Sequence, residues 1–155
     1  MPVRKLKEFL DEGKIKYVCV SHSVAYTAQE IAARAHVRGN ELAKTVMVKL
    51  DGKMAMAVLP ATYQIDFNLL KKASGAKTAQ LATEAEFKGL FPDCELGAMP
   101  PFGNLYGFDV YVAETLAEDD EIAFNAGSHA ELIKMSYEDF ERLVKPKVVK
   151  ISATP

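Results

Sequence analysis

A single lysine, Lys44, lies in a segment otherwise made of residues typical of a protein interior. The segment NELAKTVMVKLDGKMAMAVLP, residues 40–60, predicts two buried strands joined by a tight turn at Asp51-Gly52, a pair that tolerates positive φ angles. Because side chains alternate along a strand, Lys44 shares the more apolar face with residues such as Val46. An ammonium group at the rim of a pocket there could hold a phosphate, a carboxylate or a carbonyl oxygen.

A second interpretation of Lys44 involves no ligand. A lysine near the end of a strand can lay its aliphatic stem along apolar surface and send its ammonium to water. The spacing alone slightly favours this structural role. If the ammonium is instead desolvated in a pocket, its pKa should fall.

Two further segments could contribute to the same pocket. The loop GAMPPFG, residues 97–103, combines glycine, which lets a ligand approach the backbone, with proline, which fixes the loop shape. Its backbone N–H groups could face a developing oxyanion, or the loop could be a structural corner without a ligand. The segment NAGSH, residues 125–129, follows an expected strand and could line the pocket floor. Adjacent Ser128 and His129 would point to opposite sides of an extended chain, which makes them a poor catalytic dyad.

Other kinds of site have little support. The histidines His22, His36 and His129 lack metal-ligand spacing, and Cys19 and Cys94 form no CxxC pair. The sequence holds no phosphate-binding or dinucleotide-binding motif. We therefore expect no metal, no cofactor and two free thiols in a reducing compartment.

The surrounding elements are expected from apolar periodicity, capping residues and turn signals. Helices are expected over residues 3–12, 28–37, 67–74, 84–90 and 137–144. Strands are expected over residues 16–22, in the two arms of 40–60, and over 77–81, 108–114, 121–127 and 130–135. Many connections are too short for regular βαβ crossovers, so the pattern favours an α+β fold with a mixed, barrel-like β-sheet surrounded by helices.

Length and charge set the remaining expectations. The 155 residues are expected to form one domain, 1–155, with a packed loop at 91–107, a core over about 20–145 and a loose tail at 146–155. The net charge of −2 argues against an extended grip on nucleic acid, so contacts with a nucleic acid should be local. No apolar run is long enough to cross a bilayer and no signal peptide is evident, which predicts a cytoplasmic protein.

Three motifs, in this order, resemble the YbaK/prolyl-tRNA synthetase-associated domains, which are aminoacyl-tRNA deacylases. The motifs are ELAKTVMVK around Lys44, GAMPPFG at 97–103 and NAGSHAELIKMS at 125–136, and YQIDFNLLKKASG fits the middle of the family. The resemblance implies a mixed, barrel-like sheet surrounded by helices. It also implies hydrolysis of the ester that joins a wrong amino acid to its tRNA, a trans-editing reaction. The implied partner is the acceptor end of an aminoacyl-tRNA, with an aminoacyl-tRNA synthetase as a second candidate and with no DNA and no membrane.

The resemblance also implies roles for individual residues. Lys44 matches the family's essential lysine, Gly97 a glycine that shapes the pocket, and His129 a histidine of alanine-editing members, so these three are the expected catalytic residues. Cysteine-editing members usually carry a Gly-Lys-Arg-Gly-like segment where this chain has Gly127 to Ala130, so the amino acid removed stays open. The expected substrate-binding residues are their motif neighbours Thr45, Ala98, Pro101, Phe102, Gly103, Gly127 and Ser128.

The expected chemistry is direct attack of water on the ester, because no serine or cysteine nucleophile is evident. Lys44 would hold the 3′-terminal phosphate or polarise the ester carbonyl, and the ribose 2′-hydroxyl of the substrate could assist. Two other functions stay open. The domain could bind an aminoacyl or nucleotide ligand without turnover, or Lys44 could form a Schiff base with a carbonyl substrate.

Overall fold

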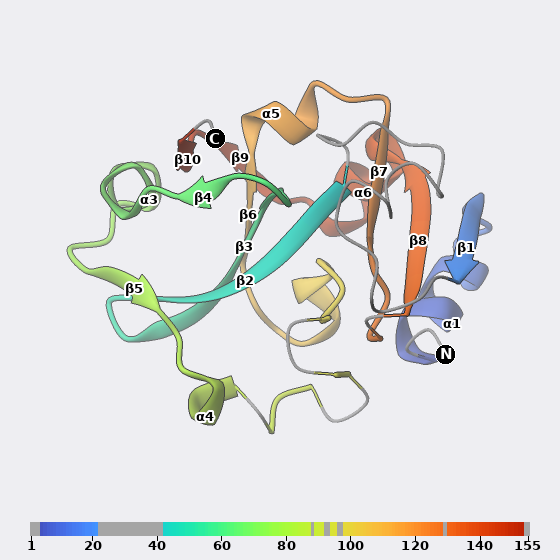
Figure 1. The fold of residues 1–155 in the computed structure, drawn as a ribbon, viewed down its shortest axis with the longest axis horizontal. Coiled ribbons are helices and arrows are strands. Elements are labelled where there is room, and N and C mark those ends of the chain that lie inside the picture. The colour runs from blue at the N-terminus through green and yellow to red at the C-terminus, as the bar shows by residue number, and fades with distance from the viewer. Residues whose placement is uncertain are drawn as a thin grey trace.

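The computed structural model describes residues 4–21, 42–87, 89–91, 94–95, 98–128 and 130–153. Eight strands form one sheet in the order β1-β8-β7-β2-β3-β6-β9, with β5 also paired to β2, and β4 and β10 form a second, two-stranded sheet (Figure 1). The strands are β1 (Tyr17–Ser21), β2 (Leu42–Leu50), β3 (Lys53–Pro60), β4 (Gln64–Ile65), β5 (Ala79–Leu81), β6 (Val110–Ala113), β7 (Glu121–Asn125), β8 (Glu131–Ser136), β9 (Lys147–Val149) and β10 (Ser152–Ala153).

Helices lie around this sheet. They are α1 (Arg4–Glu12), α3 (Phe67–Ser74), α4 (Glu84–Phe87), α5 (Glu114–Ala117), α6 (Tyr137–Val144) and a 3₁₀ turn, η2 (Gly103–Leu105). The sheet is mixed, because β2–β7, β3–β6 and β6–β9 are parallel and the other pairs are antiparallel. The α+β class and the mixed sheet expected from the sequence are thus confirmed. The expected helix over 28–37 lies outside the described residues.

The hairpin of β2 and β3 forms where the sequence predicts it. Asp51 and Gly52 have φ angles of 52° and 83°, the left-handed conformations that a tight two-residue hairpin turn requires. The Asp51 carboxylate also accepts hydrogen bonds of 2.9 Å from the backbone N–H groups of Lys77 and Thr78. The turn therefore also fixes the chain that enters β5.

Capping residues set the helix ends. The Asp66 side chain accepts from two N–H groups at the start of α3, and Gly75 ends that helix with φ 75°. The reciprocal capping box of Thr83 and Glu86 starts α4, which ends at Phe87 and is shorter than expected. Glu86 also pairs with Lys49 of β2 at 2.6 Å, and this hydrogen bond is the main cause that lowers the pKa of Glu86 to about 2.

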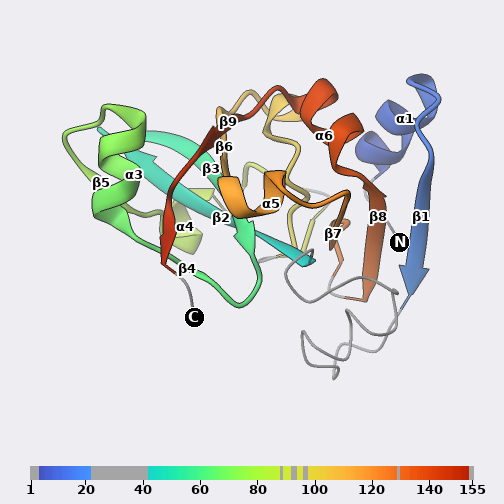
Figure 2. The same cartoon turned by 90° about the horizontal axis from the view of Figure 1, so that it is seen from above.

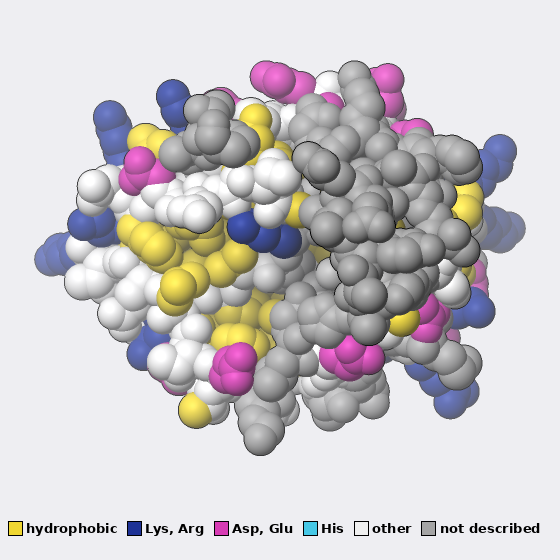
Figure 3. Space-filling view, in the orientation of Figure 1, with side chains coloured by type: hydrophobic (Ala, Val, Ile, Leu, Met, Phe, Trp, Pro, Cys, Tyr) yellow, Lys and Arg dark blue, Asp and Glu magenta, His cyan; other side chains and the backbone are white. Residues whose placement is uncertain are grey.

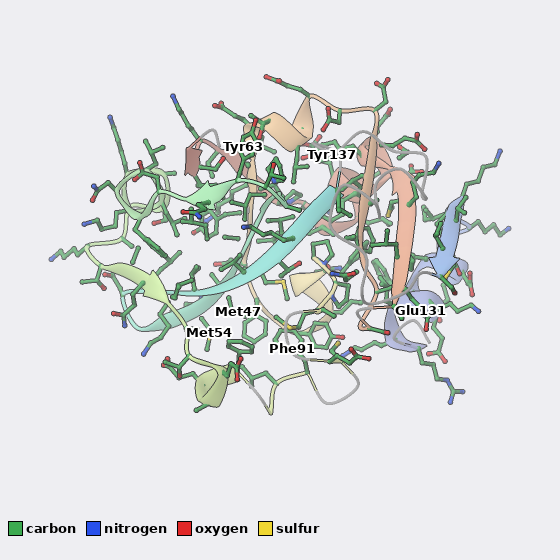
Figure 4. All side chains as sticks on the ribbon, in the orientation of Figure 1. Met47, Met54, Tyr63, Phe91, Glu131 and Tyr137 are labelled. Carbon is green, nitrogen blue, oxygen red and sulfur yellow. The ribbon has the colours of Figure 1, made fainter. Side chains whose placement is uncertain are left out.

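Two hydrophobic cores lie on the two faces of the β2–β3 hairpin, as the nearly continuous apolar run of both strands predicts. The larger core contains Met47, Phe91 and Phe102 together with side chains of α1 and α6. The smaller core contains Val48 and Leu59 and lies under α3, with Tyr63 packed against it. Figure 4 shows Met47 and Phe91 on one side of β2 and Tyr63 on the other, and Figure 2 shows α3 at one end of the molecule and α1 and α6 toward the other.

The expectation of a loose tail at 146–155 is wrong for the described part of that segment. β9 adds a parallel strand to β6, and β10 pairs with β4, with Ser152 opposite Ile65. Between them, Ile151 is fully buried in the smaller core, and its carbonyl accepts a 2.9 Å hydrogen bond from the Asp66 N–H. The sequence KVVKISATP does not show this role by itself, because the partners of β9, β10 and Ile151 are residues distant in the chain.

We expect Ile151→Ala to lower the free energy of unfolding by about 2–5 kcal/mol, since it removes a buried side chain and leaves a cavity. Val148→Ala is the matched control, because Val148 lies in neighbouring β9 and is 40% exposed. Urea unfolding followed by circular dichroism measures both. Equal effects of the two substitutions would contradict a structural tail.

Candidate functional site

The site expected around Lys44 lies where β2 changes partner. One edge of β2 pairs with β3 from Ala43 to Leu50. Along the other edge, the described register with β7 covers Leu42 and Ala43, and the register with β5 begins at Val48. On this edge, residues 44–46 pair with neither β7 nor β5 in the described register. They border a gap in the strand pairing between β7 and β5.

Backbone groups of β2 face this gap. The carbonyl of Met47 accepts a 3.0 Å hydrogen bond from the N–H of Ala82, just past β5, so the backbone groups of Met47 point toward the edge of β2 that contains the gap. Backbone groups of alternate residues point toward the same edge of a strand, so the N–H and carbonyl of Thr45 also face the gap. The Thr45 side chain lies on the face of Ala43 and Met47, which belong to the larger core.

The Lys44 side chain lies on the opposite face, in a pocket of about 250 Å³. The other described lining residues are Val46, Gln64, Ile65, Phe67 and Leu81. Figure 3 looks onto this face and shows hydrophobic surface over β2, β4 and β5 with basic surface at its border. Lys44 is partly buried, and this burial lowers the pKa of its ammonium from the ordinary value of 10.5. Among the described residues, no carboxylate forms an ion pair with it.

The second and third predicted segments lie together. The N–H of Gly127 donates to the carbonyl of Ala98 at 2.8 Å, and the N–H of Glu95 donates to the carbonyl of Gly127 at 2.8 Å. Gly127 has φ 93°, a conformation that favours glycine. The next side chain, Ser128, is buried, and its hydroxyl accepts from the Ala130 N–H at 3.1 Å, which closes a tight turn.

This turn follows β7, which is parallel to β2. Ala43 pairs with Phe124, so the chain beyond Phe124 starts beside the gap that opens beyond Ala43. The structure thus brings Lys44, Thr45 and the paired segments at 98 and 127 to one region of the sheet. Gly97 and His129, the other expected catalytic residues, lie outside the described residues.

The remaining loop residues are buried rather than open to a pocket. Phe102 is fully buried, and its ring packs against Phe9, Phe124 and Phe140 with centroid separations of 5.5–6.2 Å. Pro101 and Gly103 are buried beside it. The described pocket lining contains no residue of 98–103 or 127–128. These positions fix the loop through packing, and their expected contact with substrate stays a prediction.

Sequence reasoning missed most of the pocket lining. Ile65 and Phe67 come from β4 and the start of α3, and Leu81 comes from β5, so no local motif joins them to Lys44. The capping signal at Asp66 predicts the helix start but not the surface that its next residue faces. Within the described ranges, no cluster of His, Cys, Asp and Glu could hold a metal ion, and no helix is long and apolar enough to cross a membrane.

We expect Gly103→Ala to lower the free energy of unfolding by about 1–3 kcal/mol. A Cβ at this position would lie 2.6 Å from Val110 Cγ2 and 2.8 Å from the Phe108 carbonyl oxygen. Gly89→Ala is the control, because a Cβ there would meet nothing within 4 Å. Urea unfolding of the two variants should separate them, and equal stabilities would show that the loop tolerates the added methyl group.

Lys44→Met should raise the free energy of unfolding at pH 7. Burial lowers the pKa of Lys44 in the folded state, so folding disfavours the charged ammonium at every pH below that lowered value. The cost fades as the pH rises through the lowered pKa and is absent above 10.5, where both states are neutral. The gain from the substitution should therefore shrink as the pH approaches 10.5.

Urea unfolding of wild type, Lys44→Met and Lys72→Met across this pH range tests that dependence. Lys72 lies exposed on α3, so its replacement should have a small effect at every pH. A gain from Lys44→Met that does not depend on pH would indicate better packing rather than relief of a desolvated charge.

Known proteins share the sequence family and the fold of this chain. Residues 22–143 match the family described as the aminoacyl-tRNA editing domain. The chain is 28% identical over 159 residues to the multifunctional Ser/Thr-tRNA deacylase ProXp-y of Escherichia coli K12, covering 97% of this chain and 93% of that protein. It is 24% identical over 93 residues to a proline–tRNA ligase of Bacillus cereus, a match that covers 60% of this chain and 16% of the ligase.

A solved structure has the same fold. A candidate trans-editing enzyme for prolyl-tRNA synthetase superposes with a TM-score of 0.83 at 18% identity, covering 97% of this chain and 96% of that one. Together, the comparisons confirm the resemblance expected from the three motifs and the deacylase class that it implies. Since the matching family covers most of the sequence, the chain belongs to the aminoacyl-tRNA editing domain family.

Proposed function

We propose that this protein is a trans-editing deacylase that hydrolyses the ester of a mischarged aminoacyl-tRNA, with Lys44 as its central functional group. The observation that carries the proposal is a desolvated ammonium, without a carboxylate partner among the described residues, at a gap in the sheet. Partial burial of the charge costs stability, and an anionic or strongly polar ligand would compensate that cost.

Lys44 would bind the terminal phosphate of the tRNA or the ester carbonyl. Either group places negative charge, present or developing, next to the ammonium. The partly buried position strengthens this attraction because less water screens it. The backbone that carries Lys44 belongs to a strand with pairing partners on both sides of the gap, so the origin of this side chain is fixed before the substrate arrives.

Backbone N–H groups would stabilise the oxyanion that forms when water attacks the ester. The N–H of Thr45 faces the gap, and Gly97 lies one residue before Ala98, whose carbonyl is fixed by Gly127. We assign Gly97 and His129 to the same reaction through their motifs. Ala98, Gly127 and Ser128 would shape the border of the gap beside Lys44, and Pro101, Phe102 and Gly103 would fix the loop shape from the core.

The described residues favour direct attack of water over a covalent intermediate. The described lining residues include no serine or cysteine, and the Ser128 hydroxyl accepts a hydrogen bond from the Ala130 N–H. Hydrolysis then requires a positioned water and a stabilised carbonyl oxygen. The substrate 2′-hydroxyl could orient this water.

The substrate is proposed to be a small amino acid on a tRNA of the proline system. The similar Escherichia coli protein is named for serine and threonine, and other similar proteins are proline–tRNA ligases. Because a synthetase can reject an amino acid that differs by one methylene only by roughly 1–3 kcal/mol, a second hydrolytic site is useful. With a net charge of −2, the chain would grip only the acceptor end, and a synthetase could hold the rest of the tRNA.

We expect the wild type to release one amino acid from a panel of Ala-, Cys-, Ser- and Thr-charged tRNA(Pro). Lys44→Ala should reduce the rate by about 10²–10³-fold, the usual loss when one charge-stabilising donor is removed. Lys72→Ala should leave the rate unchanged, and circular dichroism should show that both variants fold.

Two results would contradict this function. Stoichiometric binding of charged tRNA without release would indicate a binding module. A borohydride-trapped adduct of a carbonyl compound at Lys44 would instead indicate a Schiff-base enzyme, which the lowered pKa of Lys44 would also suit.

A further inference from the structure

An apolar wall stands beside Lys44, formed by Val46, Ile65, Phe67 and Leu81. It is partly open to solvent: Leu81 is 58% exposed, and the other three are partly buried. Leu81 pairs with Val48 across the sheet and therefore lies on the same face as Lys44 and Val46. Apolar surface that is exposed to water in the free protein favours binding of a ligand that covers it, because removing this surface from water lowers the free energy.

We propose that the apolar wall is a stacking surface for the nucleobase of the terminal nucleotide, with Phe67 and Leu81 as its principal contacts. This inference rests on the proposed function for the identity of its ligand. A nucleotide combines an anionic phosphate with a flat, largely apolar base, and the pocket combines one ammonium with one apolar wall. Aromatic side chains bind bases in this way in many proteins that hold single-stranded nucleic acid.

The surroundings of Lys44 are polar toward the gap and apolar toward α3 and β5. This difference indicates that the base would bind at the apolar wall. Toward the gap lie backbone groups of Thr45 and the hydrogen-bonded segments at 98 and 127, which suit a polar ester and its amino group. Toward α3 and β5 lie the apolar wall and the side chain of Gln64. In an aminoacyl-nucleotide the base and the ester leave the ribose at different carbons, so the two ends can occupy the two sides.

Gln64 adds a polar group to the wall. It is exposed, lines the same pocket and carries both a donor and an acceptor on its amide. An amide of this kind can pair with the N6 and N7 atoms of adenine. The wall with Gln64 therefore suits a purine and in particular an adenine.

Backbone contacts fix the segment that carries Ile65 and Phe67 of the apolar wall. Asp66 caps α3 directly before Phe67, and its own N–H donates to the carbonyl of buried Ile151. Ile65 pairs with Ser152 of β10. A stacking surface must keep its orientation before the base arrives, and these backbone contacts supply that rigidity.

Binding of two small ligands tests the inference without any turnover. Adenosine 5′-monophosphate and ribose 5-phosphate carry the same phosphate and sugar, and only the first has a base. We expect the wild type, titrated by NMR, to bind adenosine 5′-monophosphate about 5- to 150-fold more tightly, the range for one stacked base. Phe67→Ala and Leu81→Ala should move this ratio toward one. Lys44→Met should weaken both ligands and leave the ratio largely unchanged.

Two further variants serve as controls for this interpretation. Phe67→Tyr keeps an aromatic ring and should keep the ratio, and Leu90→Ala removes an exposed apolar side chain outside the pocket lining and should not change it. A purely structural role of Phe67 would weaken both ligands together and leave their ratio intact. A wild-type ratio near one, or a ratio unchanged in both Phe67→Ala and Leu81→Ala, would overturn the inference.

The outcome is separable from that of the proposed function. If charged tRNA is not hydrolysed but the affinity ratio behaves as expected, the nucleobase surface stands and the deacylase function fails. If charged tRNA is hydrolysed but the ratio is near one, the deacylase function stands and the nucleobase surface fails.

Discussion

The central constraint in this fold is the division of one edge of β2 between two strands. One edge of β2 is paired with β3 along nearly its whole length, whereas β7 meets the other edge at the beginning and β5 meets it at the end. Residues 44–46 lie between these two partners. In a continuous sheet, the backbone groups at this edge would form hydrogen bonds with a neighbouring strand. Here the edge instead faces the gap, next to the Lys44 side chain.

The electrostatics of the site follow from that constraint. Lys44 comes from a strand that is covered on both faces, and its burial lowers the pKa of the ammonium. Lys49 on the same strand shows the contrast, because it pairs with Glu86 at 2.6 Å and thereby anchors α4. One lysine of β2 is thus engaged in a structural ion pair, while the other borders a pocket in which a ligand can supply the opposite charge. We propose that a ligand supplies this opposite charge, because perturbed pKa values often mark functional sites.

Segments distant in sequence hold this arrangement together. The loop that carries residues 98–103 is anchored in the larger core by Phe102 and bound to the turn after β7 through Gly127. On the other face, β10 and Ile151 hold β4 and the first residue of α3. Rigid support of this kind is what a site needs when it must recognise one end of a substrate and exclude similar molecules.

Local structure could be predicted from the sequence. Three features depend only on residues close in sequence: the turn at Asp51-Gly52, the cap at Asp66 and the position of Lys44 in an apolar strand. The three ordered motifs sufficed to indicate the family. The tertiary structure alone decided that the last strands join the sheets, that Phe102 is a core residue, and that Phe67 and Leu81 border the same pocket as Lys44. The physical reason is that backbone pairing and burial between remote segments depend on the register of the whole sheet, which no local pattern encodes.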